Sequence, residues 1–264
     1  MLFRSLWTHR GLIGDLVQRD VVGRYRGSVL GLFWSFAQPM FMLLVYTFVF
    51  SVVFNARWGD SQTDSRADFA MVLFAGLIVF TFFAECINRA PLLMISNTNY
   101  VKRVVFPLEA LTWISLGAAL FHALVSFAVW LIFFVLLYGV PHWTVLLLPV
   151  VLLPIILMIA GTSWFLAALG VYLKDTAQLT PVITTVMMFL SPIFYPVEKV
   201  PVSLRPLLMI NPLAPGLEHI RSILWKGQVP ALDAWGLYAL ACGLMAWGGF
   251  AFFQKMRRGF ADVL

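Results

Sequence analysis

The ionisable residues that could do chemistry here are few, and three of them lie within or beside long apolar runs. Glu85, Glu109 and His122 are the candidates for groups near a membrane midplane, where proton- or sodium-coupled carriers hold ionisable residues. Each also has a structural explanation. Glu85 stands four residues before Arg89, the favourable order for a helical ion pair, and Glu109 beside Pro107 suits a helix N-terminus. His122 fits a packed, hydrogen-bonded helix residue, so the pattern disfavours ion coupling.

Motifs for catalysis, metal binding and ATP hydrolysis are missing. The sequence contains no HExxH, CxxC, GxSxG or GxxxxGK[ST], so we expect no catalytic residue, no metal site and no ATPase activity of its own. Cys86 and Cys242 fall inside or at the edge of apolar runs, which predicts free, buried thiols. The four histidines are scattered without metal-ligand spacing: His9, His122, His142 and His219.

Composition decides which elements must position these residues. Hydrophobic residues make up 61% of the 264 residues and charged residues 11%, far from the values of soluble domains. The apolar residues form continuous runs, which predicts lipid-facing helices and not the alternating strands of a barrel. We therefore expect an all-α integral membrane protein with six transmembrane helices in one transmembrane domain, residues 1–264.

The predicted spans are separated by polar or proline-containing breaks. They cover about residues 29–54, 69–87, two spans within 110–173 divided at 139–143, then 177–195 and 234–253. Lys174 and Asp175 mark a tight turn, and Pro39 can bend the first span. The domain thus divides into an interface segment (1–28), spans one to five (29–195), a polar segment (196–233), and span six with its tail (234–264).

Two segments beside the spans have amphipathic patterns. Residues 6–22 place Leu6, Ile13, Leu16, Val17 and Val21 on one helical face, which predicts an amphipathic helix in the membrane interface. The segment 196–233 is too polar to span but holds two short amphipathic pieces, 204–210 and 216–225. We expect short re-entrant half-helices there; an extended loop is the alternative.

The distribution of lysine and arginine predicts the orientation. Twelve of these residues lie on the side of both termini and six on the other, so both termini should face the cytoplasm. This topology explains the net charge of +6, and nothing indicates nucleic-acid binding. The first 28 residues are charged throughout, which predicts an uncleaved anchor and no signal peptide.

Five segments in chain order carry a resemblance to a known family. They are RDVVGRYRGSVLGLFWSFAQP, NTNYVKRVVFP, SPIFYPVEKVP, NPLAPGLEHIRSIL and the tail FADVL. Together they resemble the membrane (permease) subunit of type-2 ATP-binding-cassette exporters for cell-envelope polysaccharides, nearest to O-antigen exporters and similar to capsule and teichoic acid exporters. The resemblance implies a homodimer in the bacterial inner membrane with a continuous channel. It further implies two nucleotide-binding partner subunits that hold ATP and Mg²⁺, and a cargo attached to polyprenyl pyrophosphate.

The resemblance also implies roles for two basic clusters. Arg24, Tyr25 and Arg26 stand where the headgroup region meets the first span, and the guanidinium groups of Arg24 and Arg26 could attract the lipid pyrophosphate bidentately. Residues 90–104 would contain a coupling helix that docks on the ATPase through Tyr100, Lys102 and Arg103. Ordinary positive-inside anchoring in membrane lipid explains the charge of the first cluster equally well. For the second cluster coupling is favoured, because a loop that only anchors would not need this length.

Aromatic and apolar residues are the candidates for the channel and its gate. Trp34, Phe41 and Tyr46 could stack on sugar rings in a channel, although most aromatic residues of a span face lipid or pack between helices. The resemblance places a periplasmic gate at the half-helices, with four candidates: Tyr195, Leu204, Ile210 and Trp225.

Other functions remain open beside export of an O-antigen-like glycan. Within the same fold they are a capsular polysaccharide or teichoic acid exporter and an exporter of small molecules or lipids. A membrane enzyme or a scaffold of envelope assembly is the alternative from another class. An enzyme would need a cluster of carboxylates or histidines at one membrane face, which the sequence does not contain.

Overall fold

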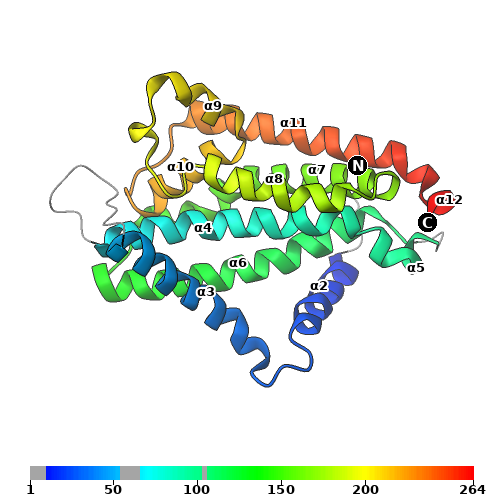
Figure 1. The fold of residues 1–264 in the computed structure, drawn as a ribbon, viewed down its shortest axis with the longest axis horizontal. Coiled ribbons are helices and arrows are strands. Elements are labelled where there is room, and N and C mark those ends of the chain that lie inside the picture. The colour runs from blue at the N-terminus through cyan, green and yellow to red at the C-terminus, as the bar shows by residue number, and fades with distance from the viewer. Residues whose placement is uncertain (1–9, 54–65, 103–105) are drawn as a thin grey trace.

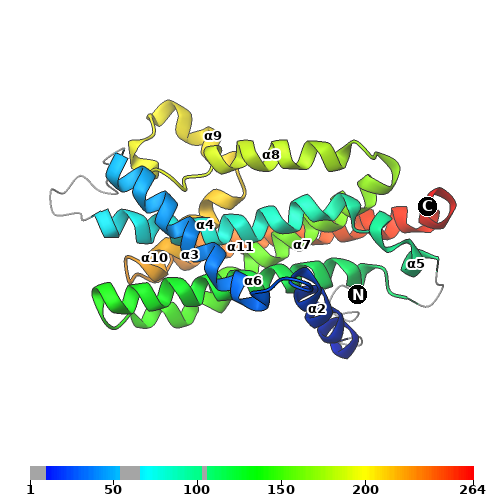
Figure 2. The same cartoon turned by 60° about the horizontal axis from the view of Figure 1, so that its bottom comes forward.

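The computed structural model describes residues 10–53, 66–102 and 106–264, and each regular element in these ranges is a helix. The long helices α4 (Arg66–Arg89), α6 (Glu109–Tyr138), α7 (Leu148–Tyr172) and α11 (Leu232–Met256) run along one common direction (Figures 1 and 2). The predicted all-α class is therefore confirmed for the described residues.

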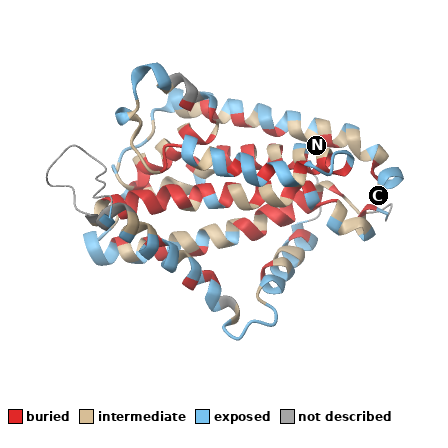
Figure 3. Cartoon of the chain, viewed as in Figure 1, coloured by how far each residue is buried: buried red, intermediate tan, exposed pale blue. Residues whose placement is uncertain are grey.

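Four helical segments are long and apolar enough to cross a membrane. They are Ala67–Leu92, Glu109–Tyr138, Trp143–Tyr172 and Leu232–Val263, and they correspond to predicted spans two, three, four and six. The first of them is the most buried, and α4 lies in the centre of the bundle (Figure 3). This protein is thus an integral membrane protein with a helical core.

Predicted spans one and five have shorter helices than expected. Residues 29–30 are not helical, and a 3-10 turn (Gly31–Phe33) precedes α3 (Trp34–Tyr46), which contains Pro39 and continues as a π-helical stretch, Thr47–Val53. Helix α8 (Thr176–Leu190) has 15 residues and ends before Ser191 and Pro192, because a residue before proline disfavours helical dihedrals. The predicted ends at 29 and 195 are therefore wrong.

The predicted break at 139–143 and the turn at Lys174 and Asp175 are confirmed. Helix α6 ends at Tyr138, and Gly139 follows with φ +84°, a conformation that glycine adopts without strain. Helix α7 follows a 3-10 turn, Trp143–Leu147. The chain then reverses between Tyr172 and Thr176, so α8 runs antiparallel to α7.

The segment 196–233 contains helices, so the alternative of an extended loop is wrong. Helix α9 (Arg205–Ile210) is followed by α10 (Leu213–Leu224), which packs on α7 and α4. The Asn211 side chain joins this segment to the end of α8. It accepts a bond from the backbone N–H of Leu213 (3.0 Å) and donates to Oγ of Ser191 (2.7 Å).

The predicted apolar face of the N-terminal helix α2 (Arg10–Arg24) packs against other helices of the chain. Ile13 and Val21 are buried, and Leu16 and Val17 pack on the core, where α2 contacts α6. Leu6 lies outside the described residues. A helix is therefore present in this segment, with its buried face covered by α6, and its predicted location in the membrane interface stays a prediction.

Segments predicted to be cytoplasmic share one end of the bundle. Helix α5 (Thr98–Val101) and helix α12 (Phe260–Val263) lie at this end, with α9 and α10 toward the opposite end (Figure 1). The predicted topology requires this arrangement.

A close glycine contact fixes the crossing of α7 and α11, and we expect Gly249→Leu to destabilise it. A Cβ atom at Gly249 would clash with the carbonyl oxygen of Gly161, and small residues are what permit such close approach of membrane helices. Overpacking costs about 1–3 kcal/mol where side chains can adjust, so backbone contact should cost at least the upper value.

The neighbouring glycine is the matched control. Gly248 has open space where its Cβ would be, so Gly248→Leu should leave the thermal unfolding midpoint in detergent nearly unchanged. Equal midpoints for the two variants would contradict this close crossing.

Candidate functional site

A cleft of about 550 Å³ opens where α2 meets α4, α6 and the turn before α5. Three arginines line it, Arg19, Arg24 and Arg89, together with Asp20 and His122. Apolar residues of α2 and α6 complete its walls. The cleft is therefore a cationic site built from segments far apart in the sequence.

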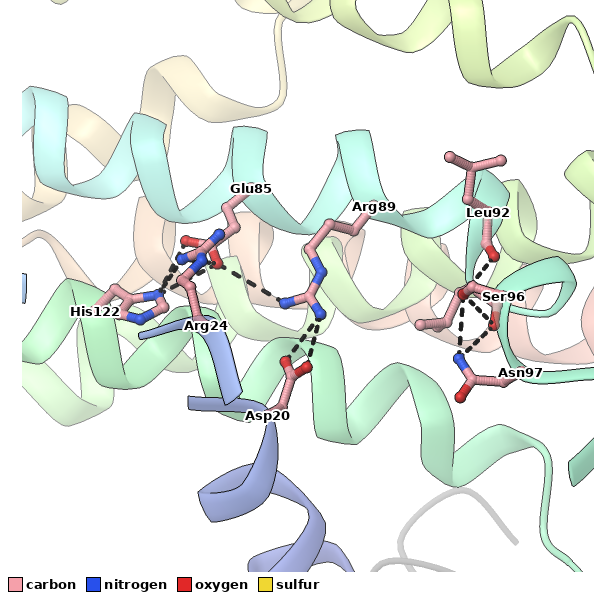
Figure 4. Close-up of polar contacts among 9 residues, drawn as sticks. Asp20, Arg24, Glu85, Arg89, Leu92, Ser96, Asn97 and His122 are labelled. Carbon is pink, nitrogen blue, oxygen red and sulfur yellow. Dashed lines mark hydrogen bonds and ion pairs between the residues drawn. The ribbon is translucent and has the colours of Figure 1, made fainter. Parts of the chain in front are cut away.

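Two helices position the charges by the same spacing. On α2, Asp20 precedes Arg24 by one turn; on α4, Glu85 precedes Arg89 by one turn, so each helix presents both charges on one face. The charges pair crosswise (Figure 4). Arg89 donates to both carboxylate oxygens of Asp20 at 3.0 and 2.9 Å, and Arg24 lies 2.8 Å from Glu85.

Glu85 is the central acceptor of the cluster. Its side chain is only 12% exposed, and its nearest partner is Arg24 at 2.8 Å, whereas Arg89 lies 3.9 Å away. The predicted pair with Arg89 is thus the weaker contact, because Asp20 engages the Arg89 guanidinium. The sequence spacing identified the helix neighbour but not the partner on another helix.

His122 joins α6 to this cluster. Its Nδ1 lies 2.8 Å from an Arg24 nitrogen and 3.2 Å from a Glu85 oxygen. Its Nε2 is buried and has no hydrogen-bond partner among the described residues. The prediction of a packed, hydrogen-bonded histidine is confirmed at Nδ1.

The three residues of the predicted headgroup cluster separate in the structure. Arg24 lines the cleft, while the Tyr25 ring meets His122 edge-on, with centroids 6.0 Å apart. Burial raises the pKa of Tyr25 despite the opposing charge of Arg24. Arg26 is exposed in the turn after α2 and does not line the cleft.

Of the predicted coupling residues, Tyr100 also lines the cleft. It is half-buried on α5 and stacks on Phe106, with ring centroids 4.6 Å apart. Lys102 is exposed at the end of this turn. Arg103 lies outside the described residues. The cleft thus contains Arg24 from the first predicted cluster, and Tyr100 with Leu93 and Asn97 from the second predicted segment.

The predicted channel residues lie on one helix. Trp34 and Phe41 are exposed on α3, and Tyr46 is half-buried with its ring 6.4 Å from that of Phe194. The structure therefore leaves two of the three rings available for contact outside this chain.

The predicted gate residues differ in their surroundings. The Tyr195 hydroxyl donates to the carbonyl of Phe189 at 3.0 Å, and burial raises the pKa of Tyr195. Leu204 and Ile210 are exposed, and Trp225 packs edge-on against Tyr138 at 5.3 Å. In the described part of the chain, the four predicted gate residues therefore have different neighbours.

Arg221 is a residue that the sequence analysis missed. It is 2% exposed and donates to the carbonyl of Ile193 (3.0 Å) and to Glu218 (3.2 Å). Burial lowers the pKa of Arg221 to about 10. The available signal was its spacing from Leu217 and Leu224, which places an arginine on the apolar face of α10.

The candidates for ion coupling are engaged in structural pairs. Glu109 begins α6, as predicted, and Arg257 donates to it at 2.9 Å, while Glu85 and His122 belong to the cluster above. Cys86 and Cys242 are free and buried, as expected. No group of three metal-ligating side chains occurs in residues 10–53, 66–102 and 106–264.

The long apolar helices identify the chain as a polytopic α-helical membrane protein, and the cationic cleft is its candidate site. Residues 12–225 match the model of the ABC-2 type transporter family, and the chain belongs to this family. The resemblance seen in the sequence is thereby confirmed at the level of the family.

Three relatives show how far the likeness extends. The O-antigen export system permease protein RfbA of Myxococcus xanthus is 28% identical, with 100% of this chain and 99% of the relative covered. A protein of the same name from Klebsiella pneumoniae is 23% identical (96% and 95% covered). The polysialic acid transport protein KpsM of Escherichia coli is 23% identical (81% of each).

Proposed function

We propose that this chain is the permease subunit of an ATP-driven exporter that moves a lipid-linked, O-antigen-like polysaccharide across the bacterial inner membrane. The observation that carries the proposal is the end-to-end similarity to a permease named for O-antigen export. Relatives named for polysialic acid and capsule polysaccharide transport favour a glycan over a small molecule or a lipid. Export of a capsule polymer or teichoic acid is the second candidate.

The energy source in this proposal is a separate ATPase. The sequence has no phosphate-binding loop, so ATP and Mg²⁺ belong to two partner subunits at the end that holds α5 and α12. Both termini then face the cytoplasm, in keeping with the lysine and arginine bias. Tyr100, Lys102 and Arg103 belong to the segment that docks on the ATPase and transmits its motion.

The proposed assembly contains two copies of this chain with six spans each. Helices α3 and α8 supply spans one and five, and both expose apolar side chains, such as Phe41 on α3 and Val182 on α8. Trp34, Phe41 and Tyr46 would contribute aromatic surface to the channel. Helices α9 and α10 would be the re-entrant gate on the periplasmic side, with Tyr195, Leu204, Ile210 and Trp225.

Co-purification with the ATPase encoded beside the gene tests the proposal. We expect a stable 2:2 complex, ATP hydrolysis that needs both proteins, and surface glycan in a strain whose own exporter is deleted. A cysteine at Tyr100 should cross-link to the ATPase surface. A chain that purifies alone and works without an ATPase would contradict the proposed function.

A further inference from the structure

We propose that the C-terminal hook, residues 257–264, is a brace that makes the adjoining ends of α6, α7 and α11 move as one body, so that motion of the ATPase reaches the membrane spans. The hook contains the tail FADVL, one of the five segments that resemble the exporter family. The inference rests on the proposed function, in which an ATPase docks at this end of the bundle. It adds the residues that receive the motion.

The hook folds back onto the helix bundle although it is a chain end. After α11 the chain forms a 3-10 turn, Arg257–Gly259, and the short helix α12. Phe260 is completely buried, and its ring lies 5.5 Å from that of Phe253 and 6.1 Å from that of Tyr172, measured between centroids. The side chain of Leu264 also packs against the core. Chain ends are poorly ordered unless specific contacts hold them, so these contacts make the hook part of the fold.

Tyr172 joins the hook to the end of α7. Its hydroxyl donates to the carbonyl of Met256 at 3.0 Å, and the last four carbonyls of a helix such as α11 lack α-helical partners. Gly259 makes this contact possible, because a Cβ atom there would lie 2.5 Å from the Tyr172 oxygen. Tyr172 is also the last residue of α7 before the turn at Lys174 and Asp175. The hook therefore holds the start of that turn.

Arg257 joins the hook to the start of α6. It donates to the Glu109 carboxylate at 2.9 Å, and the Glu109 side chain is only 13% exposed. The carboxylate lies at the N-terminus of α6 and the guanidinium at the C-terminus of α11, where the helix dipoles favour these charges. The indole of Trp164 on α7 donates to the Glu109 carbonyl at 3.3 Å. The ends of three helices therefore meet beside the hook.

Both ends of the segment proposed to dock on the ATPase lead to these helix ends. The segment begins with the 3-10 turn Ala90–Leu92, which packs on α7, and a Cβ atom at Gly170 would clash with the carbonyl oxygen of Pro91. It returns at Glu109, the partner of Arg257. The hook and α5 lie at the same end of the bundle in both views (Figures 1 and 2). A force on the segment would therefore act on the helix ends that the hook joins.

Loss of the brace should separate ATP hydrolysis from export. Hydrolysis belongs to the partner subunits, and the proposed docking residues Tyr100 and Lys102 are not part of the hook. A permease without the brace should therefore still bind the ATPase and support hydrolysis. Its helix ends would move separately, so the motion would not reach the channel. In this inference Arg257, Tyr172 and Phe260 are positioning residues.

Arg257→Gln tests the brace at its ion pair, and Arg258→Gln, in the same turn but exposed, is the matched control. ATP hydrolysis is measured on the complex in nanodiscs, and surface glycan is measured in cells per assembled complex. For Arg257→Gln we expect glycan to fall about fivefold or more while hydrolysis stays within about twofold of the parent. Arg258→Gln should match the parent in both. A proportional fall of export and hydrolysis, or normal export, would overturn the inference.

A milder variant tests the contact with α7 without removing a charge. Gly259→Ala should displace the Tyr172 hydroxyl, and Gly248→Ala, which has open space for its Cβ on α11, is its control. Amide hydrogen exchange in the complex then reports the helix ends directly. Gly259→Ala should increase exchange in residues 168–173 as well as in 257–264, because the two are released together. An increase confined to 257–264 would contradict the brace.

A conservative variant and the parent separate this inference from the proposed function. Arg257→Lys keeps the charge and should restore most of the export, because the pair with Glu109 uses a single guanidinium nitrogen. Export as low as that of Arg257→Gln would overturn the role of the ion pair. A parent that recruits no ATPase or exports no glycan would instead contradict the proposed function.

Discussion

Replacing Arg221 with Leu is expected to lower the stability of the protein by about 3 kcal/mol, the lower value for breaking a buried ion pair, because Glu218 is partly exposed. The guanidinium is the buried donor that joins α10 to the Ile193 carbonyl in the loop after α8. Its loss leaves this carbonyl and Glu218 unpaired. The thermal unfolding midpoint in detergent and the amount of surface glycan should both fall.

Arg205 provides the matched control for this prediction. It begins α9 and also donates to backbone carbonyls, those of Val200 and Glu198 at 3.1 and 2.9 Å, but these lie only five and seven residues before it and nearer to solvent. Arg205→Leu should therefore cost less than about 1 kcal/mol. Arg221→Lys should restore only part of the stability, since one ammonium cannot fork between two acceptors. An Arg221→Leu protein as stable as the parent would show that the pair does not hold α10.

The helix breaks were predictable because local chemistry determines them. Gly139 and Pro141 end α6, and Lys174 with Asp175 forces the next turn, whatever the surrounding helices do. The start of α3 was not predictable from hydropathy. Val29 and Leu30 are as apolar as the residues that follow, yet the chain makes a turn at Gly31 (φ +49°) before the helix begins.

The cleft was predictable in parts and not as a whole. Charge spacing along the sequence identifies Glu85 with Arg89 and highlights Arg24, because each lies on a short local pattern. The crosswise pairing depends on how α2 crosses α4 and α6, a tertiary property with no local signature. The sequence therefore indicated an oxyanion site at Arg24 and Arg26. In the structure, Arg24 shares the cleft with Arg89, which is 65 positions away by residue number, and not with Arg26.

The separation of Arg24 from Arg26 makes two explanations of this basic cluster testable. Positive-inside anchoring depends on charge near the end of a span, so Arg24 and Arg26 should contribute equally to it. Anion binding depends on geometry, and of these two arginines Arg24 alone lines the cleft, together with Arg19 and Arg89. A comparison of single substitutions can therefore distinguish the two explanations where the double substitution cannot.

Arg24→Gln should lower export per inserted permease by about tenfold or more, and Arg26→Gln by less than about twofold. A hydrogen bond to a charged group contributes about 1.5–3 kcal/mol, and 1.4 kcal/mol corresponds to a tenfold change in binding. Surface glycan is measured by immunoblot, normalised to the permease recovered with its ATPase. Arg24→Lys keeps the charge without the forked geometry and should fall between the parent and Arg24→Gln.

Glu85→Gln distinguishes loss of the ligand group from loss of the ion pair that holds α2. It removes the internal competitor of Arg24 but leaves the guanidinium in the cleft, so the diphosphate binding expected at Arg24 should strengthen although α2 loses an ion pair. Arg24→Gln also loosens α2 but removes the group that binds. We therefore expect diphosphate affinity to rise in Glu85→Gln and to fall in Arg24→Gln. If Arg24→Gln and Arg26→Gln instead lose equal amounts of inserted protein, anchoring is the role of both arginines.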